Sequence, residues 1–441
     1  MPQSHTSDRV ADIVARTLYA HMVRHAFGVP GGEIVALIDA LEAVGIPFHL
    51  ARHETSAAIM AAGASTISRN PELLVTTVGP GLANAVNGIA DAAQEHIPLI
   101  VISGIVDRAT RSRYTHQVID HAQLLRPLVK ASFEIEPESA ASTVARALAI
   151  ATTEPMGPVH LDLSPSVAAS TTPERSVPGP ATRFTVSASV TEPAIALLTE
   201  RIRSAERPLI LAGLQAVRSN SGAAVLQLAE TIGAPVVTTY KAKGLVPEIH
   251  PLCLGGAGLS PMADRILLPL IQKADLVLTI GYDPIEMRLG WLDFVSDQSK
   301  LIDICNTVPD HAMHHAGTWI LGDPRGVLQA LNSRIAERKT WHGGEPLHAK
   351  AELERIFSRE DLWGPHAIVD HLNRAAGAND LVTVDSGAHR ILLSQKWIAA
   401  QPLTLLQSAG FCTMNAALPL AIGAFIADRS RRVFSVMGDG G

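Results

Sequence analysis

The sequence predicts an α/β protein with three consecutive domains, each built on a parallel sheet, the third of them incomplete. Short apolar runs alternate with helical segments from residue 8 to about residue 170, and the alternation resumes twice later in the chain. The runs are apolar throughout, which is typical of strands that are buried on both faces of a parallel sheet. We expect the domains to cover residues 1–170, 191–333 and 362–441.

The composition limits the classes of function. Hydrophobic residues make up 47% of the 441 residues but aromatic residues only 4%, so the core must be aliphatic. A net charge of -6 without charged blocks argues against nucleic-acid or membrane-surface partners. No apolar run could span a bilayer, and the first ten residues lack the apolar stretch of a secretory signal. Cys253, Cys305 and Cys412 form no CxxC pair, which fits a cytoplasmic protein.

The first domain brings several turns to one edge of its sheet. We expect helices over residues 10–25 and 34–43, a third that begins at residue 55, and a fourth that follows the turn at 78–81 and runs through residue 93. The expected strands are at residues 26–29, 48–51, 73–77, 98–103 and 159–162. Gly31, Glu54 and the turn at 78–81 each follow one of these strands. Because ligands of parallel sheets bind beyond the carboxyl ends of the strands, we expect these residues to lie there together.

Glu54 is the candidate catalytic residue of this edge. It lies between a short strand, which we expect to be buried, and a helix rich in alanine. The N-terminus of that helix favours a charged carboxylate, and this stabilisation is also a purely structural explanation for an acidic residue. Burial beside Ile59 and Met60 would instead favour the neutral acid and suit it for acid–base catalysis. The segment alone leaves both roles open.

The second and third domains follow two connecting segments. Residues 164–190, rich in Ser, Thr and Pro, and residues 338–346 are the expected connectors. The apolar strands are expected at residues 209–212, 235–239, 276–280, 301–304, 381–384, 403–406 and 433–436. The sequence stops at Gly438-Asp439-Gly440-Gly441, directly after the last strand. A crossover helix normally follows such a strand, so we expect the third domain to be incomplete.

An ordered set of motifs runs along the whole chain. In order they are FGVPGGE (27–33), RHE (52–54), VGPGLANAVNGIADA (78–92), IPLIVISG (97–104), THQVID (115–120), TTYKAKGLVPEIHPLCLG (238–255), VDSGAH (384–389), SAGFCTMNAALPLAIGA (408–424) and the final GDG. Together they resemble the thiamine-diphosphate-dependent enzymes, particularly the acetolactate synthase-like branch.

The resemblance implies roles for individual residues. It identifies Glu54 as the proton relay to the aminopyrimidine ring of the cofactor, Met414 as the residue that holds the cofactor bent, and Asp439 as a Mg²⁺ ligand. The cofactor-binding positions that it implies are Pro30, Gly31, Pro80, Asn84, Gln117, Gly387, His389, Gly410, Met414, Gly438, Asp439 and Gly440.

The resemblance also implies an activity. It indicates a thiamine-diphosphate-dependent transferase or lyase that decarboxylates a 2-keto acid and transfers or ligates the remaining unit. It further implies a homodimer or homotetramer with sites between subunits. A second metal ligand, an Asn downstream of GDG, lies beyond the sequence.

Three departures from the synthase pattern are visible. Ala388 replaces a polar residue, His116 replaces an aromatic one, and residues 281–288 differ from the flavin-contact segment, so FAD is not favoured. The alternatives that stay open are a decarboxylase or carboligase of the same fold and a non-catalytic truncated remnant.

Two further sets of residues have competing explanations. His311, His314 and His315 have a spacing that suits zinc, but no Cys or acidic neighbour completes the set, so a solvated segment is favoured. Lys130 and Arg126 could face a substrate carboxylate, and surface or ion-pair roles explain them at least as well.

Overall fold

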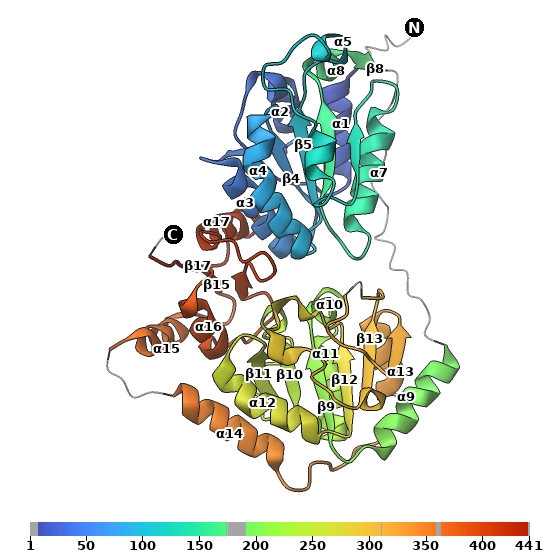
Figure 1. Ribbon diagram of the computed structural model, residues 1–441, viewed down its shortest axis with the longest axis vertical. Helices are drawn as coiled ribbons and strands as arrows, with labels where there is room; N and C mark the ends of the chain where they lie inside the picture. The colour runs from blue at the N-terminus through green and yellow to red at the C-terminus, as the bar shows by residue number, and fades with distance from the viewer. Residues whose placement is uncertain (1–7, 173, 175–190, 310, 359–362, 440–441) are drawn as a thin grey trace. The chain divides into compact units, whose positions relative to one another are not determined.

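The computed structural model describes residues 8–172, 174, 191–309, 311–358 and 363–439. These residues form two compact units (Figure 1). The first contains the described residues within 1–184 and 408–441, and the second those within 185–407. The part of the chain that we expected to form the third domain is therefore divided between the two units. Within the described residues, no helix is both long enough and apolar enough to cross a bilayer.

The first unit is organised around a six-stranded parallel sheet with the order β3-β2-β4-β5-β7-β6. The strands of this sheet are β2 Ala26–Gly28, β3 Phe48–Leu50, β4 Glu72–Thr76, β5 Leu99–Gly104, β6 Ser132–Glu134 and β7 Val159–Leu163. A further strand of the first unit, β17 Val433–Val436, comes late in the chain and lies outside this sheet. A separate antiparallel pair consists of β1 Asp8–Arg9 and β8 Thr171–Thr172.

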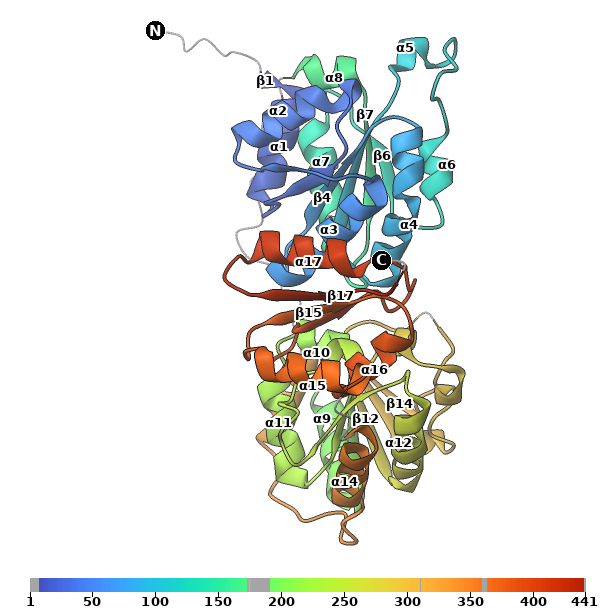
Figure 2. The same cartoon turned by 90° about the vertical axis from the view of Figure 1, so that its left-hand side faces the viewer.

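The helices of the first unit cover both faces of this sheet (Figure 2). They are α1 Val10–Ala20, η1 Gly32–Ile34, α2 Val35–Ala43, α3 Glu54–Ser68, α4 Pro80–Gln94, α5 Arg108–Arg111, α6 His121–Leu125, α7 Ala140–Thr152, α8 Pro165–Ala169 and α17 Ala417–Ala427. Side chains alternate along each strand. Leu73 and Val75 of β4 therefore pack in the core with α1 and α7, whereas Leu74 packs with α3 and α4. The prediction of a parallel sheet with both faces covered is confirmed.

Three local predictions in this unit were wrong. The helix expected to reach residue 25 ends at Ala20, because the chain turns at Met22, whose φ is 71°. The strand before Glu54 is not buried, since β3 lies at the edge of the sheet and Leu50 is 70% exposed. The helix that follows begins at Glu54, one residue earlier than expected.

Helix α3 packs closely against two neighbouring helices, since small residues line its contacts. A Cβ atom on Gly88 of α4 would lie 2.6 Å from Cβ of Ala58. A Cβ atom on Gly63 of α3 would lie 2.6 Å from the carbonyl oxygen of Leu420 in α17. Alanine-sized side chains at these points set the position of α3, and hence of Glu54 at its first turn.

The second unit contains another six-stranded parallel sheet, with the order β11-β10-β9-β12-β13-β14. Its strands are β9 Pro208–Ala212, β10 Val236–Thr239, β11 Cys253–Ala257, β12 Leu276–Ile280, β13 Leu301–Cys305 and β14 Thr318–Leu321, and two further strands, β15 Leu381–Val384 and β16 Leu405–Gln407, pair in parallel. The helices are α9 Glu192–Ser204, α10 Leu214–Arg218, α11 Gly222–Ile232, η2 Tyr240–Ala242, α12 Pro261–Lys273, η3 Pro284–Glu286, η4 Leu289–Trp291, η5 Gln298–Lys300, α13 Pro324–Asn332, α14 Glu345–Phe357, α15 Pro365–Ala375 and α16 Ala388–Lys396.

Candidate active site

Glu54 lies at the N-terminus of α3 with only 7% of its surface exposed. The side chain of His53 caps this helix by accepting from the N–H of Thr55 at 3.2 Å. Asn84 in the second turn of α4 donates from Nδ2 to Oε2 of Glu54 at 3.1 Å, and its carbonyl accepts from the Thr55 hydroxyl at 2.6 Å. The carboxylate is therefore held between two helix N-termini by a neutral amide.

The turns that follow β2 and β4 lie beside this carboxylate. A Cβ atom on Gly81 would lie 3.4 Å from Oε1 of Glu54, and it would also meet the side chain of Thr77. A Cβ atom on Gly31 would meet the same Thr77 side chain. The structure thus brings Gly31, Gly81 and Glu54 together at the carboxyl edge of the sheet, as the strand order predicts. Pro30 and Pro80, which belong to these two turns, are exposed.

Gln117 lies next to the second turn through its backbone. Its φ is 61°, its side chain is exposed, and its carbonyl oxygen packs against Gly79. Gly79 itself has φ 57° and ψ -98°, a region that L-residues rarely adopt. The conformation of the turn therefore depends on glycine at this position.

A buried polar group behind the turn was missed by the sequence reasoning. The N–H of Gly79 donates to Nε2 of His121 at 3.2 Å, and Nδ1 of His121 lies 2.7 Å from Oδ1 of Asp162. Burial opposes the charge on Asp162, but hydrogen bonds with His121 and His160 outweigh it and hold the pKa of the carboxyl below its ordinary value. The signal was present in the sequence, because His160 and Asp162 interrupt the otherwise apolar strand β7.

The late segment of the first unit carries further expected site residues. Glu95 at the end of α4 accepts through Oε1 from the N–H groups of Ala409 and Gly410, both at 2.7 Å. Met414 is 79% exposed and Asp439 is exposed. Gly438 is half-buried, and Gly440 lies outside the described residues.

Gly387 and His389 belong to the second unit, at the N-terminus of α16. The ring of His389 lies against Gly387, where a Cβ atom would be 2.8 Å from Nδ1. Nε2 of His389 and Oγ of Ser386 are buried and have no hydrogen-bond partner among the described residues. Helix N-termini bind phosphate groups, and these two polar atoms are suited to the same task.

The three histidines considered for zinc form no metal-binding group within the described residues, although the ring centroids of His311 and His314 lie 5.5 Å apart. Nε2 of His314 lies 2.8 Å from Oδ2 of Asp303, and Nδ1 of His315 lies 3.2 Å from Oδ1 of Asp293. Burial raises the pKa of Asp303, although the hydrogen bond with His314 opposes this rise. The pair of His314 with a buried carboxylate explains the histidine without a metal.

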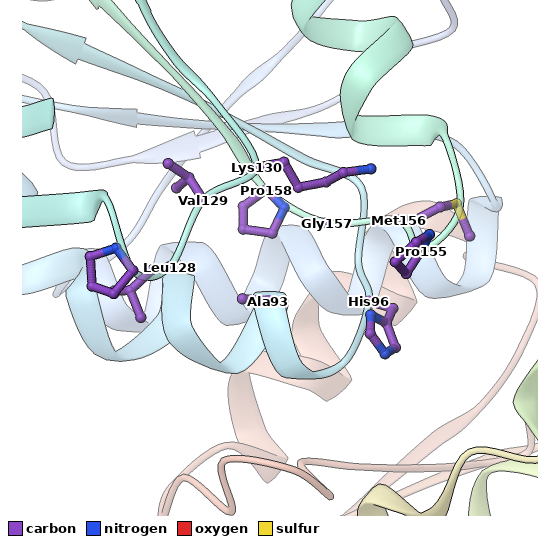
Figure 3. Close-up of a pocket in the computed structure, with 10 residues that line it drawn as sticks. Ala93, His96, Leu128, Val129, Lys130, Pro155, Met156, Gly157 and Pro158 are labelled. Atoms are coloured by element: carbon purple, nitrogen blue, oxygen red, sulfur yellow. The ribbon is translucent and has the colours of Figure 1, made fainter. Parts of the chain in front are cut away.

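A hollow of about 220 Å³ lies at the opposite edge of the first sheet (Figure 3). It is lined by the connections that lead into β5, β6 and β7, at the amino ends of these strands. Lys130 in its wall donates through Nζ to the carbonyls of Ile150 and Thr153, both at 2.6 Å, and so caps the end of α7. Ligands of parallel sheets bind at the carboxyl ends, so this hollow is separate from the site of Glu54. Lys130 therefore has a structural partner.

A parallel sheet with a buried carboxylate beside glycine turns at the carboxyl ends of its strands is typical of α/β proteins that bind ligands at that edge. Sequence comparison identifies the family. Residues 8–124 match the thiamine pyrophosphate enzyme N-terminal TPP binding domain, residues 195–331 the central domain, and residues 385–441 the C-terminal TPP binding domain. The chain belongs to the thiamine-pyrophosphate-dependent enzymes, and the resemblance drawn from its motifs is confirmed.

Curated relatives agree along the whole chain. The acetolactate synthase of Bacillus subtilis (strain 168) is 32% identical over 100% of this chain and 78% of its own length. A probable acetolactate synthase large subunit of Methanocaldococcus jannaschii is 30% identical, and the acetolactate synthase isozyme 1 large subunit of Escherichia coli (strain K12) is 28% identical. Each of these two alignments covers 98% of this chain and 76% of the relative.

Proposed function

We propose that the protein is a thiamine-diphosphate- and Mg²⁺-dependent enzyme that decarboxylates a 2-keto acid and transfers or ligates the remaining unit. The relatives named acetolactate synthase support this assignment. The proposal depends on the position of Glu54, a buried carboxylate at the carboxyl edge of the sheet. Its side chain accepts a hydrogen bond from the neutral amide of Asn84. Within the described residues, Glu54 forms no ion pair with Lys, Arg or His. A carboxylate held by a neutral amide can exchange a proton with a ring nitrogen beside it.

The remaining residues fit the cofactor by their chemistry. Ser386 and His389 offer buried polar atoms at a helix N-terminus that have no partner in the part of the chain that the structure describes, which suits a diphosphate. Asp439 offers an exposed carboxylate, and Mg²⁺ is commonly held by one or two carboxylates together with phosphate oxygens. Thiamine diphosphate supplies the electron sink for loss of carbon dioxide when it is bound. The protein supplies the proton relay at Glu54 and, through Met414, an apolar support.

The oligomeric state is part of the same proposal. The first unit exposes large apolar side chains on β3, on α17 and in the segment before α17: Leu50, Phe411, Met414, Leu418 and Phe425. Exposed apolar groups near a site mark protein interfaces. A homodimer or homotetramer with sites between subunits would cover them, and sedimentation of the purified protein measures its mass.

We place the enzyme in the cytoplasm, where its three free cysteines stay reduced.

The enzyme works without FAD in this proposal. Residues 281–288 contain Tyr282, which is buried against Phe294 and His314, and Asp283, whose side chain accepts from the N–H of Ile285. These side chains already have protein partners. Protein purified without added cofactor should therefore lack the yellow absorbance of flavin. A stoichiometric yield of released FAD would contradict this part of the proposal.

The decisive experiment is Glu54→Gln, compared with Glu72→Gln. Glu72 is a fully buried acidic residue at the opposite, amino edge of the same sheet, so it controls for replacement of a buried carboxyl group by an amide. Glu54→Gln should bind the cofactor but lose most of its proton exchange in deuterated water, because an amide cannot relay a proton. Glu72→Gln should retain exchange. Normal exchange in folded Glu54→Gln would return Glu54 to a structural role.

The products formed from a panel of 2-keto acids separate the alternatives. A branched hydroxy-keto acid indicates synthase activity, a free aldehyde indicates a decarboxylase, and a mixed acyloin indicates a carboligase. The exposed His116 lies on the loop beside Gln117 and replaces an aromatic residue of the synthase pattern, which favours a pocket other than that of the synthases. Absence of both turnover and cofactor exchange would support the non-catalytic alternative.

A further inference from the structure

A chain of polar side chains lies buried behind the turn that begins α4. Oγ1 of Thr76 donates to Oγ of Ser103 at 2.9 Å, and Oγ of Ser103 lies 3.2 Å from Nε2 of His160. Nδ1 of His160 lies 2.7 Å from Oγ of Ser132. Both ring nitrogens of His160 thus have hydrogen-bond partners within β5 and β6.

His121 connects this group to the turn itself. It is 2% exposed, and it lies with Nδ1 at 2.7 Å from Asp162 and with Nε2 at 3.2 Å from the N–H of Gly79. A backbone N–H can only donate, so Nε2 of His121 must present its lone pair. The ring proton then sits on Nδ1 and is donated to Asp162. The two contacts together fix one tautomer of the imidazole.

The same argument excludes a metal as the explanation of this group. Ligand atoms of His121, His160 and Asp162 all lie within 4.8 Å of one another, which is close enough for a cation. A metal on Nδ1 of His121 would move the proton to Nε2, opposite the N–H of Gly79. The protonated Nε2 of His121 and the N–H of Gly79 would then be two donors that face each other in a buried site, and neither would have an acceptor.

The contact with Gly79 reaches the candidate catalytic carboxylate through α4. The carbonyl of Gly79 accepts from the N–H of Ala83 at 2.9 Å and so closes the first turn of the helix. Asn84 follows directly and donates to Glu54 at 3.1 Å. His121 is the side chain that holds the other end of this turn, because it accepts the buried N–H of Gly79.

We propose that His121 is a positioning residue of the enzyme: Asp162 selects its Nδ1–H tautomer, and Nε2 then anchors the Gly79 turn that sets Asn84 against Glu54. This inference rests on the proposed role of Glu54 in the reaction. It assigns Asp162 and His121 to the site without placing either of them in contact with the cofactor.

The test uses His121→Phe, His121→Gln and Asp162→Asn in the full chain, with Ser132→Ala as the matched control. Phenylalanine fills the space but offers no acceptor to Gly79, whereas glutamine can present an oxygen near the position of Nε2. Loss of a hydrogen bond to a buried donor should lower kcat about tenfold or more in His121→Phe. The Michaelis constant should change less, and His121→Gln should recover much of the loss. Ser132→Ala removes the hydrogen bond with Nδ1 of His160 and alters neither hydrogen-bond partner of His121, so it should keep normal kcat.

Two readouts separate this inference from the proposed function. Hydrogen exchange of the Gly79 amide should speed up in His121→Phe and Asp162→Asn but not in Ser132→Ala. The ¹⁵N chemical shifts of His121 in the wild type should report a protonated Nδ1, whatever Glu54 does. A protonated Nε2, one zinc ion per purified chain, or full kcat in His121→Phe would each overturn the inference. If Glu54→Gln keeps normal proton exchange while the expected results for His121 are obtained, only the proposed role of Glu54 is refuted.

Discussion

Replacement of Gly88 by alanine tests how closely the two helices around Glu54 must approach. The added Cβ would lie 2.6 Å from Cβ of Ala58 and 2.8 Å from the carbonyl oxygen of Thr55. Carbon atoms pack at about 3.5–4.0 Å, so α4 must withdraw from α3 by about 1 Å. Asn84 lies one turn before Gly88 on the same helix face, so its 3.1 Å hydrogen bond to Glu54 should break.

The magnitude follows from two opposing effects. Overpacking of a tight contact costs about 1–3 kcal/mol, whereas alanine stabilises a helix interior by about 1 kcal/mol relative to glycine. We therefore expect a net loss of about 0–2 kcal/mol, confined to α3 and α4. The control is Gly326→Ala in α13, where the added Cβ lies at an ordinary 3.7 Å from Oδ2 of Asp323. This variant should be neutral or more stable.

Hydrogen exchange read by peptide is the suitable assay, because it measures opening in each helix separately. Amides of α3 and α4 should exchange faster in Gly88→Ala, and those of α13 should stay protected or slow down in Gly326→Ala. Cofactor proton exchange should also fall in Gly88→Ala. Slower exchange in α4 with a retained cofactor reaction would show that the contact is loose, and would refute the argument.

Two other predictions concern buried charges. Burial raises the pKa of Glu72 from 4.5 to about 7 against the N–H groups of Arg24 and His25. The folded protein then keeps a proton that the unfolded chain loses, so stability should fall as pH rises from 4.5 to about 7, by up to about 3 kcal/mol. The difference between wild type and Glu72→Gln in denaturant titrations should show this slope, and a constant difference would contradict it. Lys243 and Glu248 form a pair at 2.5 Å with side chains only 1% and 10% exposed. Lys243→Met should cost about 3–5 kcal/mol and Lys243→Met/Glu248→Gln much less, whereas equal losses would show that the charge of Glu248 is tolerated alone.

The central strands were predictable from sequence, whereas three of the four edge strands of the two six-stranded sheets were not. β4, β5 and β12 are buried on both faces, and each contains a continuous run of three or more apolar residues. β6, β11 and β14 were missed, and each of them lies at an edge of its sheet. An edge strand needs less apolar surface, and these three carry charged, glycine or exposed residues.

Part of the candidate site was also predictable from sequence, and part of it was not. Glu54 and the glycine turns could be located because each follows a strand directly. The contact of Gly79 with His121 and Asp162 could not, because it joins three segments that are distant in sequence. The close approach of α17 to α3 at Gly63, within the first unit, likewise joins segments that are distant in sequence.

The small-residue contacts of α3 have a consequence for engineering the substrate range. Mutations that enlarge Ala58 or Gly63 would move Glu54 together with its helix, so libraries that vary α3 should yield mostly inactive protein. Residues 112–117 are all exposed and include His116, yet the backbone at Gln117 lies against the Gly79 turn. Diversity confined to side chains of this loop can therefore change the surface beside the Gly79 turn without enlarging any residue of α3.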